Sequence, residues 1–198
     1  MPNDTQHPQA ASTIDPALLD YIDKTVSAKL DEQFGAISGQ LKTTNRATIV
    51  VFSNDLDKLF AAFAIATGAA AAQMQVSMFF TFWGLTALKK KTVLKGKSIT
   101  EKLMTLFLPS GPADAKPSKM NMLGVGQAFL KHVMKKKNVS DLPDLITLAS
   151  QLGVRMVACQ TSMDIMGIRK EELIEGLDFG GVATYIADAA DSKITLFI

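Results

Sequence analysis

Short apolar runs alternate with segments of helical periodicity along most of this chain, and this alternation limits the fold more than any other feature. The runs lie at residues 48–52, 76–82, 154–158 and 194–198 and are rich in β-branched or aromatic residues. Runs of this length predict strands buried on both faces, and helices between them supply the crossovers that parallel strands need. We therefore predict an α/β fold, a flavodoxin-like or Rossmann-like three-layer sandwich with a mostly parallel sheet of four or five strands.

Helical patterns fill the intervals between the predicted strands. Helices are predicted at residues 56–72, 99–107, 120–137, 141–152 and 180–191, with a further helical turn at 171–175. Turn chemistry supports two of the ends, because Pro109 terminates one helix and Asp141 is a suitable N-cap for another.

The first 45 residues precede the α/β domain, which is predicted to span residues 46–198. Residues 1–13 are polar and are expected to be disordered. Residues 15–41 predict an amphipathic helix, because apolar residues recur every three or four positions. Its apolar stripe is Leu18, Ile22, Val26, Leu30, Phe34, Ile37 and Leu41. This helix packs either on a neighbouring subunit or on its own domain, and the sequence leaves both open.

Cysteine and histidine usage excludes several kinds of site. Cys159 is the only cysteine, so the chain has no internal disulfide framework, no CxxC redox pair and no cysteine-based zinc cluster. The two histidines, His7 and His132, do not suggest a metal site. Gly124 and Gly126 begin like a dinucleotide fingerprint, but Phe129 stands where its last glycine should be. We expect neither a metal nor a cofactor. No secretory signal is visible, and the expected location is the cytoplasm.

Positive charge is concentrated in one segment. Residues 86–137 contain twelve lysines and two acids. Such an excess suggests an acidic partner or a small anion. Nucleic acid is not expected, because the aromatic residues cluster around 79–83 instead of alternating with the lysines.

Residues 59–88 contain no charged residue, which raises the alternative that residues 59–85 contact a membrane. The first half of the run is rich in alanine and only weakly hydrophobic, whereas the second half is aromatic and strand-like. A helix followed by a strand explains this change of character better than a membrane span does.

The stretch around Cys159 is the first candidate for chemistry. The predicted strand at 154–158 ends just before it, and Thr161 followed by Asp164 is typical of a capping box that opens a helix. A cysteine between a strand end and a helix N-terminus is placed where amides and the helix dipole favour a thiolate. The alternative is a buried structural cysteine, which behaves as a small hydrophobe.

Ligands of parallel α/β sheets bind outside the carboxyl ends of the strands. Several other residues are predicted to lie at that edge and to contribute to binding. They are Asn54, Trp83, Gly84, Gln160, Thr161, Ser162, Gly180 and Gly181.

Five stretches of the chain resemble the DsrE/DsrF-like family, in the longer branch that is often labelled peroxiredoxin-like. They are residues 53–58 (SNDLDK), 78–84 (MFFTFWG), 120–124 (MNMLG), 158–167 (ACQTSMDIMG) and 180–185 (GGVATY). The resemblance covers residues 46–198 and leaves the first 45 residues uncovered.

This resemblance implies an oligomeric α/β protein that handles reduced sulfur. In related sulfur-relay proteins a cysteine in this position accepts sulfane sulfur as a persulfide and passes it on, and Cys159 is the matching residue. The implied partner is a small sulfur carrier or a rhodanese-like donor. A peroxidase cycle is not supported, because Met156 replaces the expected threonine and a second, resolving cysteine is missing.

Three hypotheses follow for the function. The favoured one is a sulfur carrier or sulfurtransferase-like protein that accepts sulfane sulfur or thiosulfate on Cys159 and transfers it to a partner thiol. The first alternative is a non-catalytic oligomeric module that binds a small anion or nucleotide at the strand ends. The second alternative is a membrane-associated sulfur carrier. Whether the protein is an enzyme is left open.

Overall fold

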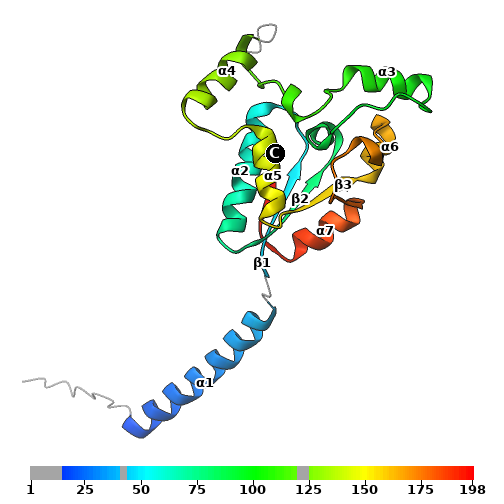
Figure 1. The fold of residues 1–198 in the computed structure, drawn as a ribbon. Helices are drawn as coiled ribbons and strands as arrows, with labels where there is room; N and C mark the ends of the chain where they lie inside the picture. The colour runs from blue at the N-terminus through cyan, green and yellow to red at the C-terminus, as the bar shows by residue number, and fades with distance from the viewer. Residues whose placement is uncertain (1–14, 41–43, 120–124) are drawn as a thin grey trace, which may run out of the picture. The chain divides into compact units, whose positions relative to one another are not determined.

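The computed structural model describes residues 15–40, 44–119 and 125–198. The chain divides into two compact units, Met1–Lys42 and Thr43–Ile198 (Figure 1). In the first unit, α1 (Pro16–Gln40) corresponds to the helix predicted over residues 15–41, and Leu41, the last residue of the predicted stripe, lies outside the described residues. Asp15 precedes it, and its carboxylate accepts the Ala17 N–H at 2.9 Å. The predicted disorder of residues 1–13 concerns a segment outside the described residues.

The second unit is built around a five-stranded sheet in which every pair of neighbours is parallel. Its strands are β1 (Thr44–Val51), β2 (Gln75–Phe80), β3 (Arg155–Cys159), β4 (Asp178–Gly180) and β5 (Ser192–Phe197). Their order across the sheet is β4-β3-β2-β1-β5. The predicted α/β sheet is therefore confirmed, with five strands. β4 was not predicted, because three residues are too few to form a visible apolar run.

Helices cover both faces of the sheet and make the three layers. α2 (Leu56–Ala71) and α5 (Leu142–Gln151) pack against each other on one face, and α7 (Val182–Ala190) lies on the opposite face (Figure 1). The chain advances from β1 to β4 in one direction and then returns to the far side of β1. Because such crossovers are right-handed, the return helix α7 lies on the face that α2 and α5 leave open.

The remaining elements are shorter and connect these layers. They are the 3₁₀ helices η1 (Phe82–Leu88), η2 (Pro112–Asp114) and η4 (Lys170–Glu172), and the α-helices α3 (Ile99–Phe107), α4 (Val125–Lys136) and α6 (Gln160–Met166). The bounds of α3 agree with the prediction, and Asp141 caps α5 by accepting the Asp144 N–H at 2.9 Å. The predicted helix over 120–137 corresponds to α4, and its first five residues lie outside the described residues.

The strands send alternate residues to the two faces, as the two-residue period of a strand requires. On the α2 and α5 side they join a large apolar core. Its fully buried members include Ile49, Val51, Leu59, Phe63, Met78, Phe80 and Ala158. On the α7 side, Phe79, Val157 and Cys159 form a much smaller cluster against Tyr185.

The charge-free run forms α2, β2 and η1, and its larger side chains are mostly buried. Phe63 of α2 packs on Phe80 of β2, with ring centroids 5.8 Å apart. None of the helices in the described part of the chain is long and apolar enough to cross a membrane.

The second predicted strand was extended too far. β2 ends at Phe80, and Phe82 begins η1 with a positive φ of 45°. Gly84 explains the bend, because a Cβ built on it would lie 2.1 Å from the carbonyl oxygen of Val51. Only glycine allows η1 to fold back this closely over the end of β1, where the Gly84 N–H donates to the Phe52 carbonyl at 2.8 Å.

Candidate functional site at the end of β3

Cys159 is the last residue of β3 and directly precedes α6. This is the strand-end, helix-start position that the sequence predicts. The neighbouring β4 is in register, with Cys159 opposite Gly180. On the other side, the pairing of Phe80 with Ala158 brings the next residue, Thr81, alongside Cys159. The thiol therefore lies at the carboxyl edge of the sheet.

The predicted capping box at Thr161 and Asp164 does not form. Cys159 itself is the N-cap residue of α6, and its side chain makes no capping hydrogen bond. Thr161 lies within the first turn, so its hydroxyl is placed too late to cap the helix. Ser162 is turned inward instead, and its hydroxyl lies 2.8 Å from the hydroxyl of Thr81. The first N–H groups of a helix have no intrahelical acceptor, so they remain available to a group at the N-cap.

Cys159 is nevertheless buried. The residue is only 3% exposed and packs with Phe79, Val157 and Tyr185. Tyr185 comes from α7, and its ring lies over Phe79 with centroids 5.7 Å apart. α7 therefore covers the side of the sheet to which the thiol belongs.

Gly180 allows α7 to approach the sheet next to Cys159. A Cβ at Gly180 would lie 2.5 Å from Oγ1 of Thr184 on α7. Gly181 is the N-cap residue of α7 and leaves open space around its Cα. Gly180 is thus required for packing, whether or not it also contacts a ligand.

The predicted site residues form two groups. Gln160, Thr161, Ser162, Gly180 and Gly181 adjoin Cys159 on β3, α6, β4 and the start of α7. The other three, Asn54, Trp83 and Gly84, lie beyond the ends of β1 and β2. β2 is the strand next to β3, and β1 follows it. All therefore lie along one edge, with neighbouring strands about 4.8 Å apart.

An aromatic group on the α7 side was not predicted. The ring of Phe52 lies 5.7 Å from that of Phe82 and 5.8 Å from that of Phe197, between centroids. All three rings are partly or largely exposed. Phe52 and Phe82 had been interpreted as ends of buried strands. Phe52 directly follows the core residue Val51, and Phe197 directly follows Leu196, which packs against the core; because successive strand residues face opposite sides, this alternation was the signal that could have placed both rings on the α7 side.

Two lysines of the basic segment are internal, so their charges do not face the acidic partner or small anion that the excess of lysines suggests. Lys97 and Glu172 form a buried ion pair at 2.8 Å, and Lys89 is buried nearby with its ammonium 3.2 Å from the Pro109 carbonyl. Burial raises the pKa of Glu172, but hydrogen bonds from Lys97 and from the amides of Val93 and Arg169 outweigh it, and the pKa falls below its ordinary value. Burial lowers the pKa of Lys89.

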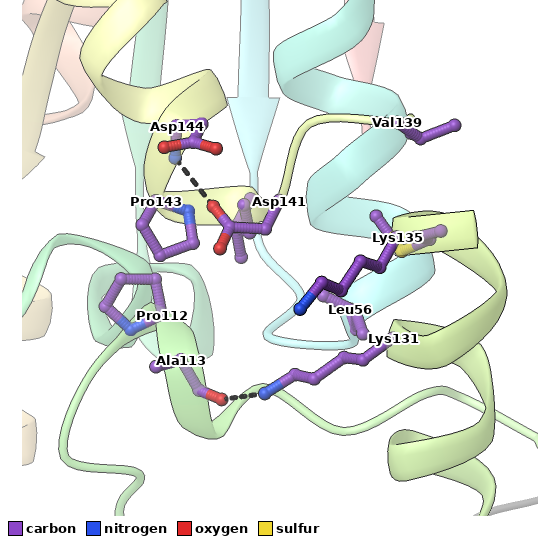
Figure 2. Close-up of a pocket in the computed structure, with 11 residues that line it drawn as sticks. Leu56, Pro112, Ala113, Lys131, Lys135, Val139, Asp141, Pro143 and Asp144 are labelled. Atoms are coloured by element: carbon purple, nitrogen blue, oxygen red, sulfur yellow. Dashed lines mark hydrogen bonds between the residues drawn. The ribbon is translucent and has the colours of Figure 1, made fainter. Parts of the chain in front are cut away.

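A separate hollow of about 420 Å³ lies between η2, α4 and the start of α5 (Figure 2). Lys131 and Ala113 both line this hollow, and the Lys131 ammonium donates a hydrogen bond to the Ala113 carbonyl at 2.6 Å. None of the predicted site residues lines it. Among the described residues, no group of three or more His, Cys, Asp or Glu side chains is arranged to hold a metal ion.

The class of protein follows from comparison with known protein families. The chain belongs to the DsrE/DsrF/DrsH-like family, whose model matches residues 43–197. This confirms the family resemblance that the sequence motifs suggested.

Two relatives match this chain over nearly their whole length. The chain is 46% identical over 156 residues to the uncharacterized protein YrkE of Bacillus subtilis strain 168, covering 78% of this chain and 98% of that protein. It is 32% identical over 157 residues to the sulfur carrier protein DsrE2 of Allochromatium vinosum, covering 77% and 98% respectively. Among solved structures, the YchN protein of E. coli matches with a TM-score of 0.48 and 15% identity, covering 77% of this chain and 98% of that one.

Proposed function

We propose that this protein is a sulfur carrier that accepts sulfane sulfur on Cys159 and passes it to a partner thiol. Family membership and the 32% identity to a protein named as a sulfur carrier support a role in sulfur relay. The observation that carries the proposal is the position of Cys159, the one cysteine of the chain, at the end of β3 and at the N-cap of α6.

The proposed step is a thiol–persulfide exchange that needs no outside oxidant. The Cys159 thiolate attacks the sulfane sulfur of a donor persulfide and forms a new S–S bond, while the old S–S bond breaks and the donor leaves as a thiolate. With thiosulfate the same attack leaves a persulfide on Cys159 and releases sulfite. A partner thiolate then attacks the outer sulfur, and the Cys159 thiolate is the leaving group.

The start of α6 supplies the electrostatics for this exchange. The first amide N–H groups, at Gln160, Thr161 and Ser162, directly follow Cys159 and have no intrahelical acceptor, so in this proposal they stabilise the cysteine thiolate before the transfer and the outer sulfur of the persulfide after it. The open hollow of about 500 Å³ beside α6 extends from Gln160 to Arg169 and Lys170. A donor or acceptor tail approaching along this hollow would meet α6 next to Cys159.

In this proposal a donor can reach the buried Cys159 thiol only when its cover moves. Tyr185 packs in the small cluster that contains Cys159, so a donor reaches the sulfur when α7 moves outward. α7 is nine residues long, and none of them is fully buried. Helices with few buried apolar contacts open at low free-energy cost, which suits a cover.

The partners follow from the single thiol. One cysteine holds sulfur but cannot release it alone, so the acceptor is a second protein, such as a small sulfur carrier, and the donor is a rhodanese-like protein. A cytoplasmic location would keep this thiol reduced.

In this proposal residues 46–198 carry the chemistry and the first 45 residues serve assembly. Val182, Ile186 and Phe197 are exposed on the α7 side and suit a homo-oligomer, which sedimentation would test.

Intact mass after incubation with thiosulfate, tetrathionate or polysulfide tests the proposal. We expect a mass gain of one or more sulfur atoms, or of thiosulfate from tetrathionate, that dithiothreitol removes and that Cys159→Ser abolishes. Release of the sulfur to a small-molecule thiol should regenerate the starting mass. An unmodified mass under conditions in which a thiol reagent does label Cys159 would contradict the proposal.

The burial of Cys159 favours a second candidate, a binding module in which this cysteine is structural. Here the strand-end residues Asn54, Trp83 and Gly180 would hold a small anion or a nucleotide without thiol chemistry. Cys159→Ala would then leave binding of the anion intact, and native Cys159 would react with thiol reagents only at the rate of global unfolding.

A further inference from the structure

Helix α3 carries four of its five large apolar residues on the outside, and the fifth, Met104, packs against the core. Ile99, Leu103, Leu106 and Phe107 lie on one side of the helix and are 86%, 56%, 77% and 76% exposed. Single exposed apolar residues are ordinary on protein surfaces, but a complete helical stripe of four large ones is not.

The opposite side of α3 is fixed to the domain by polar contacts. Thr105 is buried, accepts a hydrogen bond from the Lys97 ammonium at 2.9 Å and donates one to the Glu101 carbonyl at 2.6 Å. Lys97 is in turn held by Glu172 at 2.8 Å. Because the buried Lys97 ammonium secures the polar side of the helix, α3 cannot roll its apolar side inward without breaking the hydrogen bond between Lys97 and Thr105.

The helix is also folded before any partner arrives. Ser98 and Glu101 form a capping box, with the Ser98 N–H donating to the Glu101 carboxylate at 2.6 Å and the Glu101 N–H donating to the Ser98 hydroxyl at 3.3 Å. Glu101 also packs against α6, where a Cβ at Gly167 would lie 3.0 Å from its Cβ and Cγ. Isolated helices of nine residues are unstable in water, so the capping box and the contacts with the rest of the domain stabilise α3.

The exposed charges of the segment that contains α3 are mostly positive. Lys91, Lys95 and Lys102 are exposed, and Glu101 is the only acid between residues 91 and 107. Since the capping box engages the Glu101 carboxylate, the exposed free charges of this segment are ammonium groups, in the same stretch of chain as the apolar stripe.

We propose that α3 docks this protein on the surface of an anionic phospholipid bilayer, with Ile99, Leu103, Leu106 and Phe107 inserted among the lipid headgroups and the lysines bound to them. Leu, Ile and Phe flanked by lysine are the composition of interfacial helices. Protein interfaces are enriched instead in Tyr, Trp and Arg and depleted of Lys. A second copy would bring these lysines towards like charges.

The docking orients the molecule. α3 contacts α6, the helix that begins at Cys159, so the bilayer surface would lie next to the same edge of the domain. The two helices are neighbours in Figure 1. The inference does not depend on the sulfur chemistry, because it rests on α3 and its surroundings alone.

Flotation of the full-length protein with vesicles tests the proposal. Vesicles of phosphatidylcholine with about one-third phosphatidylserine should carry the protein upward at low salt, whereas pure phosphatidylcholine vesicles should carry much less. The variant L103N/L106N/F107N should lose at least about tenfold in partitioning. K91Q/K95Q/K102Q should lose about tenfold on the anionic vesicles only. All the substituted side chains are exposed, so unchanged thermal unfolding and circular dichroism verify that the fold is intact.

The amphipathic helix α1 provides the matched control. L18N/I22N/V26N removes an apolar stripe of similar size from the other unit and should leave flotation unchanged. A second readout is F107W in a W83F background, whose tryptophan emission should shift to the blue on addition of anionic vesicles.

Several outcomes overturn the proposal. One is the absence of flotation at low salt, and another is loss of flotation in the α1 variant with retention in the α3 variant. A third is that the α3 substitutions dissociate an oligomer seen by sedimentation while lipid binding stays unchanged, since a second copy would then cover the stripe. A tryptophan signal that ignores lipid and responds only to an added protein would assign the stripe to a protein partner.

Discussion

The two faces of the sheet are built differently. On the α2 and α5 side, large aliphatic and aromatic side chains such as Phe63, Met78 and Phe80 are fully buried in one continuous core. On the α7 side, one short helix covers a small apolar cluster, and much of the contact is polar. Asp188 of α7 accepts hydrogen bonds from Ser77 at 2.8 Å and from Arg155 at 2.7 Å.

Because of this difference, one face of the sheet determines the stability of the domain and the other determines access to the Cys159 thiol. Apolar burial scales with area and tolerates little change, so the first face sets the free energy of unfolding. Polar contacts beside solvent contribute less and exchange readily with water, so the second face can open without unfolding the domain. Cys159 belongs to the second face, where a thiol can be both protected and reached.

The largest effect is expected from Phe63→Ala on the first face. Removing a fully buried phenylalanine should lower the free energy of unfolding by about 3–5 kcal/mol, because a cavity is left between α2 and β2. Ile186→Ala on α7, where the side chain is mostly exposed, should change it by less than about 0.5 kcal/mol. Urea titrations measure both, and equal losses would contradict the contrast between the faces.

The next largest effect is expected at the ion pair behind α3, which belongs to neither face. Glu172→Gln leaves the Lys97 ammonium buried without its counter-ion and should cost about 3 kcal/mol at pH 7.

This loss should also depend on pH. The pKa of Glu172 lies below its ordinary value near 4.5, so its contribution is present above that pH and is lost as the pH falls through the lowered pKa. The stabilities of wild type and variant should therefore converge in acid. Glu175→Gln, which removes an exposed partner of Lys90, is the control and should change stability far less. A difference that is independent of pH would show that packing, and not charge, is what the substitution removes.

A moderate effect is expected from Asp188→Ala, which tests the polar character of the second face. Buried Ser77 loses its acceptor and the partly exposed Arg155 loses one of its two carboxylate partners, and the free energy of unfolding should fall by about 1–3 kcal/mol. Asp178→Ala removes only an exposed contact with Arg155 and should cost less than about 1 kcal/mol. Equal losses would mean that α7 is not held by Asp188.

The smallest effect on stability, and the most informative on access, is expected from Tyr185→Ala. This side chain covers the cluster around Cys159, so its removal should raise the rate of thiol labelling under native conditions by about tenfold or more. Ile186→Ala on the same helix provides the matched control. If labelling instead follows urea concentration in both variants, then Cys159 is reached only by unfolding, and α7 is not its cover.

The sequence was sufficient for the architecture, because the information there is local. Four of the five strands and the main helices follow from runs and periods that a reader can find without coordinates. β4 escaped because Asp178, Phe179 and Gly180 form no apolar run, and they are a strand only by pairing with β3. The end of β2 escaped for a similar reason, since Gly84 turns the chain through its contact with Val51, which is distant in sequence.

The site was predictable in its position and not in its surroundings. A cysteine between a strand run and a helix pattern located Cys159 correctly. The capping box failed because the helix begins one residue after Cys159, a boundary that composition does not determine. The packing of Tyr185 over the cluster around Cys159 and the burial of Lys97 depend on contacts between residues distant in sequence. The residues next to them in the chain do not predict either feature.

The pairing of β5 with β1 also bears on how the chain is made. β1, β2 and β3 each lie next to the strand that follows in the chain, but β1 meets β5 only after nearly the whole domain has been synthesised. Contacts between such distant segments form slowly, so β1 leaves the ribosome with one side unpaired. An unpaired strand recruits other strands, so a growing chain halted before residue 192 should aggregate more readily than one that reaches residue 197.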